Sequence, residues 1–205
     1  MKVTAFLMTI RILKTALISF RFRYATCKHP GSCHDAKVLK DSNLYKLVDN
    51  FLPNLNIQVN NVDTPCIILG DPAYPLLPWL MKPYKGRISR EEESFNVYLS
   101  RGRVVVENAF GRLKARFRRL LKRIDINYKF APKIIYTCLI LHNIVESNKD
   151  KFIENWIDAV REAEIVFPQP KKKSTREHDC LQAGAIRDNL RNFMLRFPLK
   201  RSNLV

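Results

Sequence analysis

The sequence predicts an α/β fold, and three observations support this class. Residues 66–69 form a short, continuously apolar run closed by Gly70 and Asp71, which is typical of a strand buried on both faces. Residues 98–123 repeat apolar side chains at helical spacing within a strongly basic segment. Three further segments with helical patterns follow, at residues 131–144, 152–166 and 186–197. The C-terminal half is therefore expected to be rich in helix.

Alternation, turn residues and helix caps define the N-terminal elements. Residues 20–27 alternate large side chains with Arg21, Arg23 and Ala25, which predicts a strand with one buried face. Ser32 follows a turn and is a candidate cap for a first helix. The pair Asp41-Ser42 is a candidate cap for a second helix, which Pro53 ends.

The middle of the chain contains the buried strand and the best helix. Residues 54–64 are interpreted as a polar loop, with a brief strand at residues 57–59 as an option. After the strand at residues 66–69, residues 74–81 are compatible with a helical turn. The helix at residues 98–123 has an apolar stripe that is expected to face the core, formed by Val106, Phe110, Leu113, Phe117 and Leu120.

Composition divides the chain into an atypical N-terminal segment at residues 1–19, a folded core at 20–166, a basic linker at 167–181, and a C-terminal helix and tail at 182–205. Arg11 and Lys14 interrupt the apolar N-terminal segment, which favours a short amphipathic helix over a secretory signal. The helix at residues 131–144 is apolar nearly all round and is expected to be buried. No transmembrane helix is predicted.

The chain is strongly basic. Its 205 residues include 36 Lys and Arg against 19 Asp and Glu, a net charge of +17. This excess makes a polyanion the expected partner, either nucleic acid or an anionic membrane surface. The alternative is a basic surface without such a partner. Hydrophobic residues make up 46% of the chain, enough for a packed core.

The five cysteines are scattered and include no C-x-x-C pair, which favours a reducing compartment over a disulfide scaffold. A cluster of four potential zinc ligands is an alternative to consider, although its spacing fits no standard zinc knuckle. The cluster consists of Cys27, His29, Cys33 and His34.

Two carboxylates stand out by their context. Asp71 follows the predicted buried strand, and in open α/β folds sites form at that edge of the sheet. Glu107 lies in the basic helix. Brought together, two carboxylates repel unless a cation neutralises them, and Mg²⁺ or Mn²⁺ suits oxygen ligands and phosphodiester cleavage. The plainer alternatives are a strand-end turn for Asp71 and a surface ion pair with Arg103 for Glu107.

At these residues the sequence resembles the PIF/Harbinger transposases and the nucleases derived from them. The matching motifs are His-Pro-Gly-Ser-Cys-His-Asp-Ala at 29–36, Leu-Gly-Asp-Pro-Ala-Tyr-Pro-Leu at 69–76, Pro-Trp-Leu-Met at 78–81, Phe95-Asn96, residues 103–114 with Arg116-Phe117, Leu141-His142-Asn143, and Gly-Ala-Ile-Arg-Asp at 184–188. The similarity extends over about residues 22–196.

The resemblance implies a ribonuclease-H-like DDE endonuclease core with an Asp, Asp, Glu triad that holds a divalent metal, Mg²⁺ or Mn²⁺. Asp71 matches the second Asp and Glu107 the Glu, with Asp35 and Asn96 as neighbours of the site. The first Asp has no counterpart: its position falls near Leu17, and residues 1–34 contain no acid. The core is therefore expected to be incomplete at its N-terminus, and its catalysis to be weak or absent.

The resemblance also implies DNA as the partner, with phosphate contacts from the basic helix at Arg101, Arg103, Lys114, Arg116, Arg118 and Arg119. A separate Myb/SANT-like DNA-binding partner protein and a nuclear location are expected as in the family, with the cytoplasm as an alternative. Three hypotheses follow: an impaired metal-dependent nuclease, a non-enzymatic DNA- or chromatin-binding protein, and a membrane-surface binder that uses residues 1–19. The last is disfavoured, and no membrane partner is expected.

Overall fold

The computed structural model describes residues 20–29, 33–122, 126–127, 129–166 and 179–199. The predictions for residues 1–19 and for most of the linker at 167–181 lie outside this part. The described chain divides into two compact units. We call residues 35–104 with 179–199 the strand unit, and residues 20–34 with 105–166 the helical unit.

Short helices open the strand unit: α1 (Asp35–Lys40), α2 (Asn43–Lys46) and α3 (Val48–Phe51). The predicted cap at Ser42 is confirmed, because its hydroxyl accepts a hydrogen bond from the Tyr45 backbone N–H at 3.2 Å. The predicted single helix is interrupted at Leu47, whose backbone (φ −127°, ψ 35°) is not helical. Pro53 follows directly after α3 and Leu52, as predicted.

A β-hairpin replaces most of the predicted polar loop. Strands β1 (Asn56–Val59) and β2 (Val62–Pro65) pair antiparallel, with Val59 opposite Val62. The two turn residues, Asn60 and Asn61, have φ angles of 51° and 60°. Asparagine tolerates this left-handed conformation, and two such residues form the turn that suits the twist of a two-residue hairpin. The optional strand at residues 57–59 is therefore confirmed, and its partner was missed.

The predicted buried strand is present but short. Strand β3 (Ile68–Leu69) pairs in parallel with β4 (Leu80–Met81), and Ile68 is fully buried. Among the described residues β3 has this one strand neighbour, so it is not the central strand of a larger sheet. The helical turn predicted at residues 74–81 is wrong in its last residues, because Leu80 and Met81 pair with β3 instead.

The long helix α4 (Arg90–Arg116) begins eight residues before its predicted start, because a capping box fixes its N-terminus. The Ser89 hydroxyl accepts from the Glu92 N–H at 3.3 Å, and the Glu92 carboxylate accepts from the Ser89 N–H at 2.8 Å. The helix also ends earlier than predicted, and a 3₁₀ turn, η2 (Arg118–Leu121), follows. The boundary between the two units falls between Val104 and Val105 of α4.

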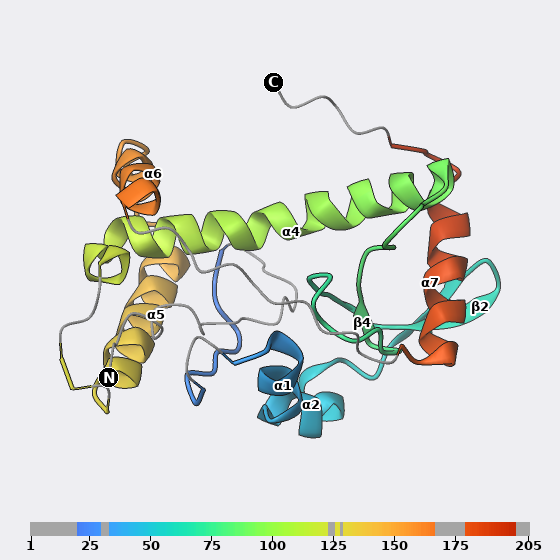
Figure 1. The fold of residues 1–205 in the computed structure, drawn as a ribbon, viewed down its shortest axis with the longest axis horizontal. Coiled ribbons are helices and arrows are strands. Elements are labelled where there is room, and N and C mark those ends of the chain that lie inside the picture. Colours follow the sequence, from blue (N-terminus) through green and yellow to red (C-terminus); the bar gives the residue numbers. More distant parts are fainter. Residues whose placement is uncertain (1–19, 30–32, 123–125, 128, 167–178, 200–205) are drawn as a thin grey trace. The chain divides into compact units, whose positions relative to one another are not determined.

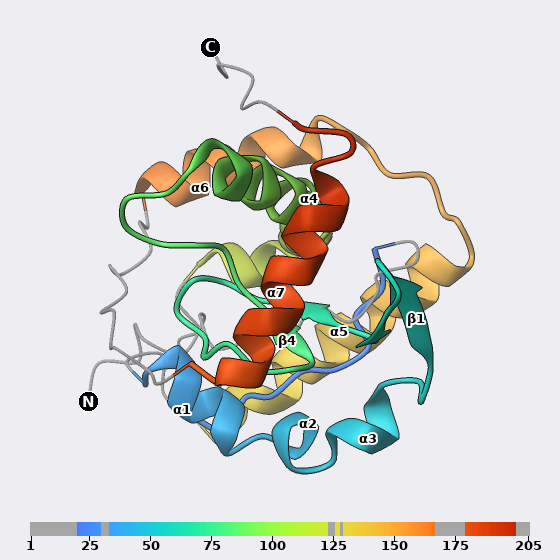
Figure 2. The same ribbon diagram turned by 90° about the vertical axis from the view of Figure 1, so that its right-hand side faces the viewer.

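The core of the strand unit forms where α4, the strands and the C-terminal helix α7 (Leu181–Met194) meet. Figure 2 shows α7 lying over β4. Cys180 and Asp179 fix the start of α7 by hydrogen bonds with the Leu76 backbone. The buried members of this core are Val59, Leu76, Met81, Phe95, Leu99, Ala183 and Leu190.

The helical unit packs α5 (Ala131–Ser147) and α6 (Trp156–Val166) on either side of the C-terminal part of α4 (Figure 1). The predicted apolar stripe of α4 is confirmed at its buried positions, Val106, Leu113 and, in η2, Leu120. The prediction that α5 is buried all round is wrong. Its side chains Tyr136, Ile140, Leu141 and Ile144 are exposed, so only one face of α5 lies in the core.

The strand predicted at residues 20–27 is wrong. Phe22 is buried in the core of the helical unit as the alternation indicated, whereas Cys27, which falls on the side of Arg21 and Arg23, is buried as well. Among the described residues the backbone of this segment pairs with no strand. A side chain of α5 takes the place of a strand neighbour: the Asn143 amide accepts from the Phe22 N–H and donates to the Phe22 carbonyl, both at 2.7 Å. The segment therefore buries its large residues while it stays outside any described sheet.

Candidate functional site

Asp71 lies at the carboxyl end of the parallel pair β3–β4. The Gly70 N–H donates to the Met81 carbonyl at 2.6 Å, which extends the strand pairing up to the residue before Asp71. The chain then turns: Asp71 Oδ1 accepts from the Ala73 N–H at 2.9 Å, and the Asp71 carbonyl accepts from the Tyr74 N–H. This side-chain turn fixes the carboxylate at the strand edge, where sites form in α/β proteins.

Helix α4 approaches β3 closely beside this edge. A Cβ atom added to Gly102 would lie 2.6 Å from Leu69 Cδ1, so the glycine permits the approach. The next residue, Arg103, reaches the site: its Nη2 lies 3.4 Å from Asp71 Oδ2. The two side chains are 19% and 25% exposed, so this ion pair is largely shielded from water.

Glu107 belongs to the part of α4 that lies in the helical unit, whereas Asp71 belongs to the strand unit. Glu107 is exposed. It follows Arg103 by four residues, which places both on the same face of α4. The surface ion pair that was the plainer alternative for Glu107 stays open, and so does its role as a metal ligand.

The described residues do not supply a complete donor set for a DDE metal site. They contain no group of three or more His, Cys, Asp or Glu side chains that could hold a metal ion. The carboxylate that matches the second acid is already paired with a guanidinium. Asp71 and Glu107 have the right chemistry for Mg²⁺, but two carboxylates, one of them already paired with Arg103, do not form a complete site for a tightly bound divalent ion.

The two predicted site neighbours have structural surroundings. Asp35 is the first residue of α1 and is buried. The Asn96 amide caps the Tyr84 backbone in both directions, accepting from its N–H at 2.8 Å and donating to its carbonyl at 3.1 Å. Asn96 thus holds the chain after β4 against α4.

The zinc alternative finds no support in the described chain, where Cys27, His29, Cys33 and His34 form no metal-binding group. Burial raises the pKa of the Cys27 thiol to about 11, although a hydrogen bond with Tyr136 partly opposes this effect. A thiol that stays protonated is a poor zinc ligand, since zinc binds the thiolate.

The six predicted DNA contacts fall into two groups. Arg101, Arg118 and Arg119 are exposed and their side chains face solvent. The other three are engaged within the protein: Arg103 with Asp71, Lys114 with Glu164 at 2.9 Å, and Arg116 with Glu146. Arg116 is only 7% exposed. We therefore correct the prediction for Arg116, because a buried, paired guanidinium cannot reach a phosphate.

The connection between α4 and α5 adds exposed cations that the prediction did not include. Lys122, Lys129 and Lys133 are all exposed, and so is the Phe130 ring. Lys133 Nζ lies 5.5 Å from the centre of that ring. Exposed cations interleaved with an aromatic side chain are typical of nucleic-acid-binding surfaces. The basic composition of residues 118–133 was the available signal.

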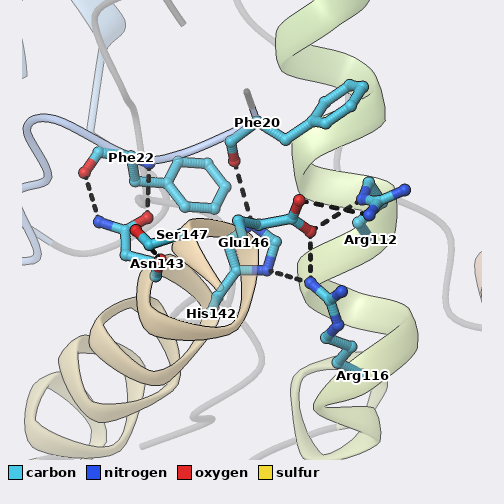
Figure 3. A network of polar contacts seen from close by, with 8 residues as sticks. All are labelled: Phe20, Phe22, Arg112, Arg116, His142, Asn143, Glu146 and Ser147. Atoms are coloured by element: carbon cyan, nitrogen blue, oxygen red, sulfur yellow. Dashed lines mark hydrogen bonds and ion pairs between the residues drawn. The ribbon is translucent and has the colours of Figure 1, made fainter. Parts of the chain in front are cut away.

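A buried polar network joins α4 to α5 in the helical unit (Figure 3). Arg112 donates to both oxygens of Glu146, from Nε at 2.9 Å and from Nη2 at 3.2 Å, and Arg116 donates to the same carboxylate. Burial alone would raise the pKa of Glu146, but the hydrogen bonds and charges of the two arginines lower it. The carboxylate is therefore ionised, and it holds the side chains of Arg112 and Arg116 in place by hydrogen bonds and charge.

His142 extends this network to the N-terminal segment (Figure 3). Its Nε2 lies 3.0 Å from the Phe20 carbonyl, so Nε2 carries the proton, and Nδ1 faces Arg116 at 3.5 Å as an acceptor. Burial lowers the pKa of His142, and the nearby arginines act in the same direction. The motif Leu141-His142-Asn143 marked this region in the sequence, but not its structural role.

Comparison with known proteins now identifies the family. Residues 7–143 match the family described as DDE superfamily endonuclease. The chain belongs to this family. The match contains both Asp71 and Glu107, and it begins well before residue 22, where we expected the resemblance to start. Part of the N-terminal segment at residues 1–19 therefore aligns with the family.

Two relatives from Arabidopsis thaliana confirm the Harbinger-derived resemblance. The chain is 33% identical over 147 residues to Protein ALP1-like, an alignment that covers 66% of the chain and 34% of the relative. It is 32% identical over 130 residues to Protein Antagonist of Like Heterochromatin Protein 1, covering 61% of the chain and 33% of the relative. The chain thus spans about a third of the length of these relatives.

No solved structure matches the chain. The described elements are a mixed helix and small-sheet arrangement consistent with a DDE nuclease domain. The ribonuclease-H-like topology stays a prediction. In the part of the chain that the structure describes, no helix has the length and apolar character needed to span a membrane.

Proposed function

We propose that this chain is a transposase-derived DDE domain that binds DNA and whose phosphodiester cleavage is impaired. The observation that carries the proposal is the family match over residues 7–143 together with the ion pair at its second acid. In this proposal Asp71 and Glu107 are what the chain retains of the family's metal site, and Mg²⁺ or Mn²⁺ binds there weakly. Asp35 and Asn96 have supporting roles in the fold around it.

A nicking assay tests the cleavage part of the proposal. The chain is incubated with supercoiled plasmid and Mg²⁺ or Mn²⁺, beside the variant Leu17→Asp, which places a carboxylate where the resemblance expects the first acid. We expect little or no nicking by the unchanged chain. Robust nicking that Asp71→Ala abolishes would show that cleavage is not impaired.

The second candidate function is DNA or chromatin binding without catalysis. It is favoured by the pairing of Asp71 with Arg103, since a carboxylate neutralised within the chain has less need of a metal. One relative's name refers to a heterochromatin protein, so a chromatin-associated partner, including the expected Myb/SANT-like protein, and a nuclear location belong to this proposal.

DNA binding is expected to depend on the exposed cations of η2, directly after α4. The double variant Arg118→Gln/Arg119→Gln should weaken binding to a fluorescent duplex, measured by anisotropy, by about tenfold or more. The matched control is Lys37→Gln/Lys40→Gln, which removes the same charge from exposed positions of α1. Equal losses for both pairs would mean that net charge alone binds the DNA.

The two candidate functions respond in opposite ways to the carboxylates. A nuclease loses cleavage on Asp71→Ala or Glu107→Ala. A DNA-binding protein keeps its affinity for the duplex in both variants. Measuring nicking and anisotropy on the same preparations therefore separates the two functions.

A further inference from the structure

The two oxygens of the Asp71 carboxylate have different partners within the strand unit. Oδ1 accepts from the Ala73 N–H at 2.9 Å and so closes the turn after β3. Oδ2 faces the Arg103 guanidinium, 3.4 Å from Nη2. The oxygen that the turn does not use is thus the one that a cation of the chain approaches.

The position of Arg103 is built into the packing of α4. Because Gly102 has no side chain, α4 can approach Leu69 of β3 closely. A Cβ atom at this position would lie only 2.6 Å from Leu69 Cδ1. Arg103 then projects from a helix that is already in contact with the strand whose end carries Asp71. Both side chains are more than two-thirds shielded from water, so the pair interacts through a medium less polar than bulk solvent.

We propose that Arg103 is an internal counter-cation that keeps divalent metal ions away from Asp71. The inference rests on the proposed function in one respect, the correspondence of Asp71 to the family's second acid. A divalent ion at Oδ2 has to displace the guanidinium or share the oxygen with it, and two cations that share one carboxylate oxygen repel each other. The role of Arg103 is therefore to neutralise Asp71 from within the chain, and its positive charge opposes metal binding.

The variant Arg103→Gln should bind Mn²⁺ about tenfold more tightly than the unchanged chain. The estimate is the Coulomb repulsion between a divalent ion and a guanidinium about 6 Å away, taken at the dielectric constant of water, and the shielded location increases it. Arg103→Lys keeps the positive charge and should leave the affinity close to that of the unchanged chain.

The experiment is a Mn²⁺ titration followed by the electron paramagnetic resonance signal of the free ion, which needs no catalytic activity. Its matched control is Arg101→Gln, which removes one positive charge from an exposed position of the same helix two residues away. We expect Arg101→Gln to change the affinity by less than about twofold. Asp71→Asn in the Arg103→Gln background should abolish the gain.

Three results would overturn the inference. One is tight Mn²⁺ binding by the unchanged chain that Asp71→Asn abolishes, since this shows that Arg103 does not exclude the ion. The second is weaker binding by Arg103→Gln in a protein whose far-ultraviolet circular dichroism is unchanged. The third is an equal gain from Arg101→Gln.

The first of these results is measured on the unchanged chain and Asp71→Asn, so it tests the inference even if Arg103→Gln does not fold. Failure of the DNA-binding proposal is recognised separately, because the anisotropy titrations contain no Mn²⁺ and depend on Arg118 and Arg119.

Discussion

Glu146 links α4 to α5 in the interior of the helical unit. Its carboxylate is buried and accepts hydrogen bonds from Arg112 and Arg116. Arg112 also stacks on two rings, 4.8 Å from the centre of Phe20 and 4.3 Å from that of Phe152. A buried ion pair of this kind adds little net stability over an apolar replacement, but removing one partner leaves the other charge uncompensated.

We therefore predict that Glu146→Ala destabilises the helical unit by about 3–5 kcal/mol, because Arg116 keeps a buried charge without its counter-ion. Urea denaturation measures this through the fluorescence of Trp156, in a Trp79→Phe background so that the signal comes from the helical unit. The control is Glu164→Ala. It removes a carboxylate that is 51% exposed and pairs with Lys114, and it should cost less than about 1 kcal/mol. Similar losses of stability in Glu146→Ala and Glu164→Ala would disprove the role of Glu146 as a buried counter-ion.

His142 should make the stability of this unit depend on pH. Its pKa in the folded protein lies below the ordinary value of 6.5, so the unfolded chain binds more protons when the pH falls through that value. Stability is then lost from about pH 6.5 downward. The pKa of Glu146 is also lowered from its ordinary value of 4.5. Its contribution to the stability of the folded protein is therefore lost only when the pH falls below about 4.5.

The expected result is a lower urea midpoint at pH 5.5 than at pH 7.5, because a protonated Nδ1 would point its new hydrogen at the Arg116 guanidinium (Figure 3). His142→Gln can still donate to the Phe20 carbonyl but does not titrate. It should remove most of the midpoint difference between the two pH values. An unchanged difference in this variant would assign the pH dependence to other groups.

At the scale of elements, two helical glycines form a natural comparison within the strand unit. Gly184 lies inside α7, and a Cβ atom added there meets nothing within 4 Å. Gly184→Ala should stabilise the unit by about 0.5–1 kcal/mol, the usual helix preference of alanine over glycine. Gly102 lies inside α4, but its added Cβ atom would meet Leu69.

Gly102→Ala should therefore gain less than Gly184→Ala by at least about 0.5 kcal/mol, because Leu69 has to leave its preferred rotamer. The fluorescence of Trp79 in a Trp156→Phe background reports on this unit during urea denaturation. Equal gains in the two variants would show that the close approach of α4 to β3 imposes no steric limit.

The sequence predicted the helices well where local signals were strong. Ser42 and Pro53 fixed the bounds of short helices, and the apolar stripe from Val106 to Leu120 located the buried face of α4. Two local signals were available but unused. The Ser89–Glu92 capping box starts α4, and the Asn60-Asn61 pair turns the hairpin.

Other features could not be predicted, because they depend on contacts between distant residues. The alternation at residues 20–27 indicated the burial of Phe22 and Thr26, but not that of Cys27, nor that Asn143 would satisfy the backbone in place of a strand. Likewise, the basic pattern of α4 did not distinguish Arg116, buried against Glu146, from the exposed Arg118 and Arg119. The motif singled out Asp71 as a candidate site residue, and only the fold revealed Arg103 beside it.

On the scale of the whole molecule, charge dominates the expected behaviour. The net charge of +17 persists after the ion pairs of the interior are formed, since a pair of opposite charges leaves the net charge unchanged. A polyanion that binds such a surface releases its condensed counterions, which makes the affinity fall steeply with salt. This salt dependence does not depend on whether Asp71 and Glu107 bind a metal ion.

We predict that the affinity for duplex DNA falls by roughly a thousandfold between 50 and 200 mM salt, as for a protein that neutralises about six phosphates. In a plot of log affinity against log salt, Arg118→Gln/Arg119→Gln should reduce the slope by about two, since two phosphate contacts are lost. Lys37→Gln/Lys40→Gln should leave the slope unchanged, because α1 contributes none of the proposed phosphate contacts. A slope near zero for the unchanged chain would contradict electrostatic DNA binding, and with it the role proposed for Arg118 and Arg119 of η2.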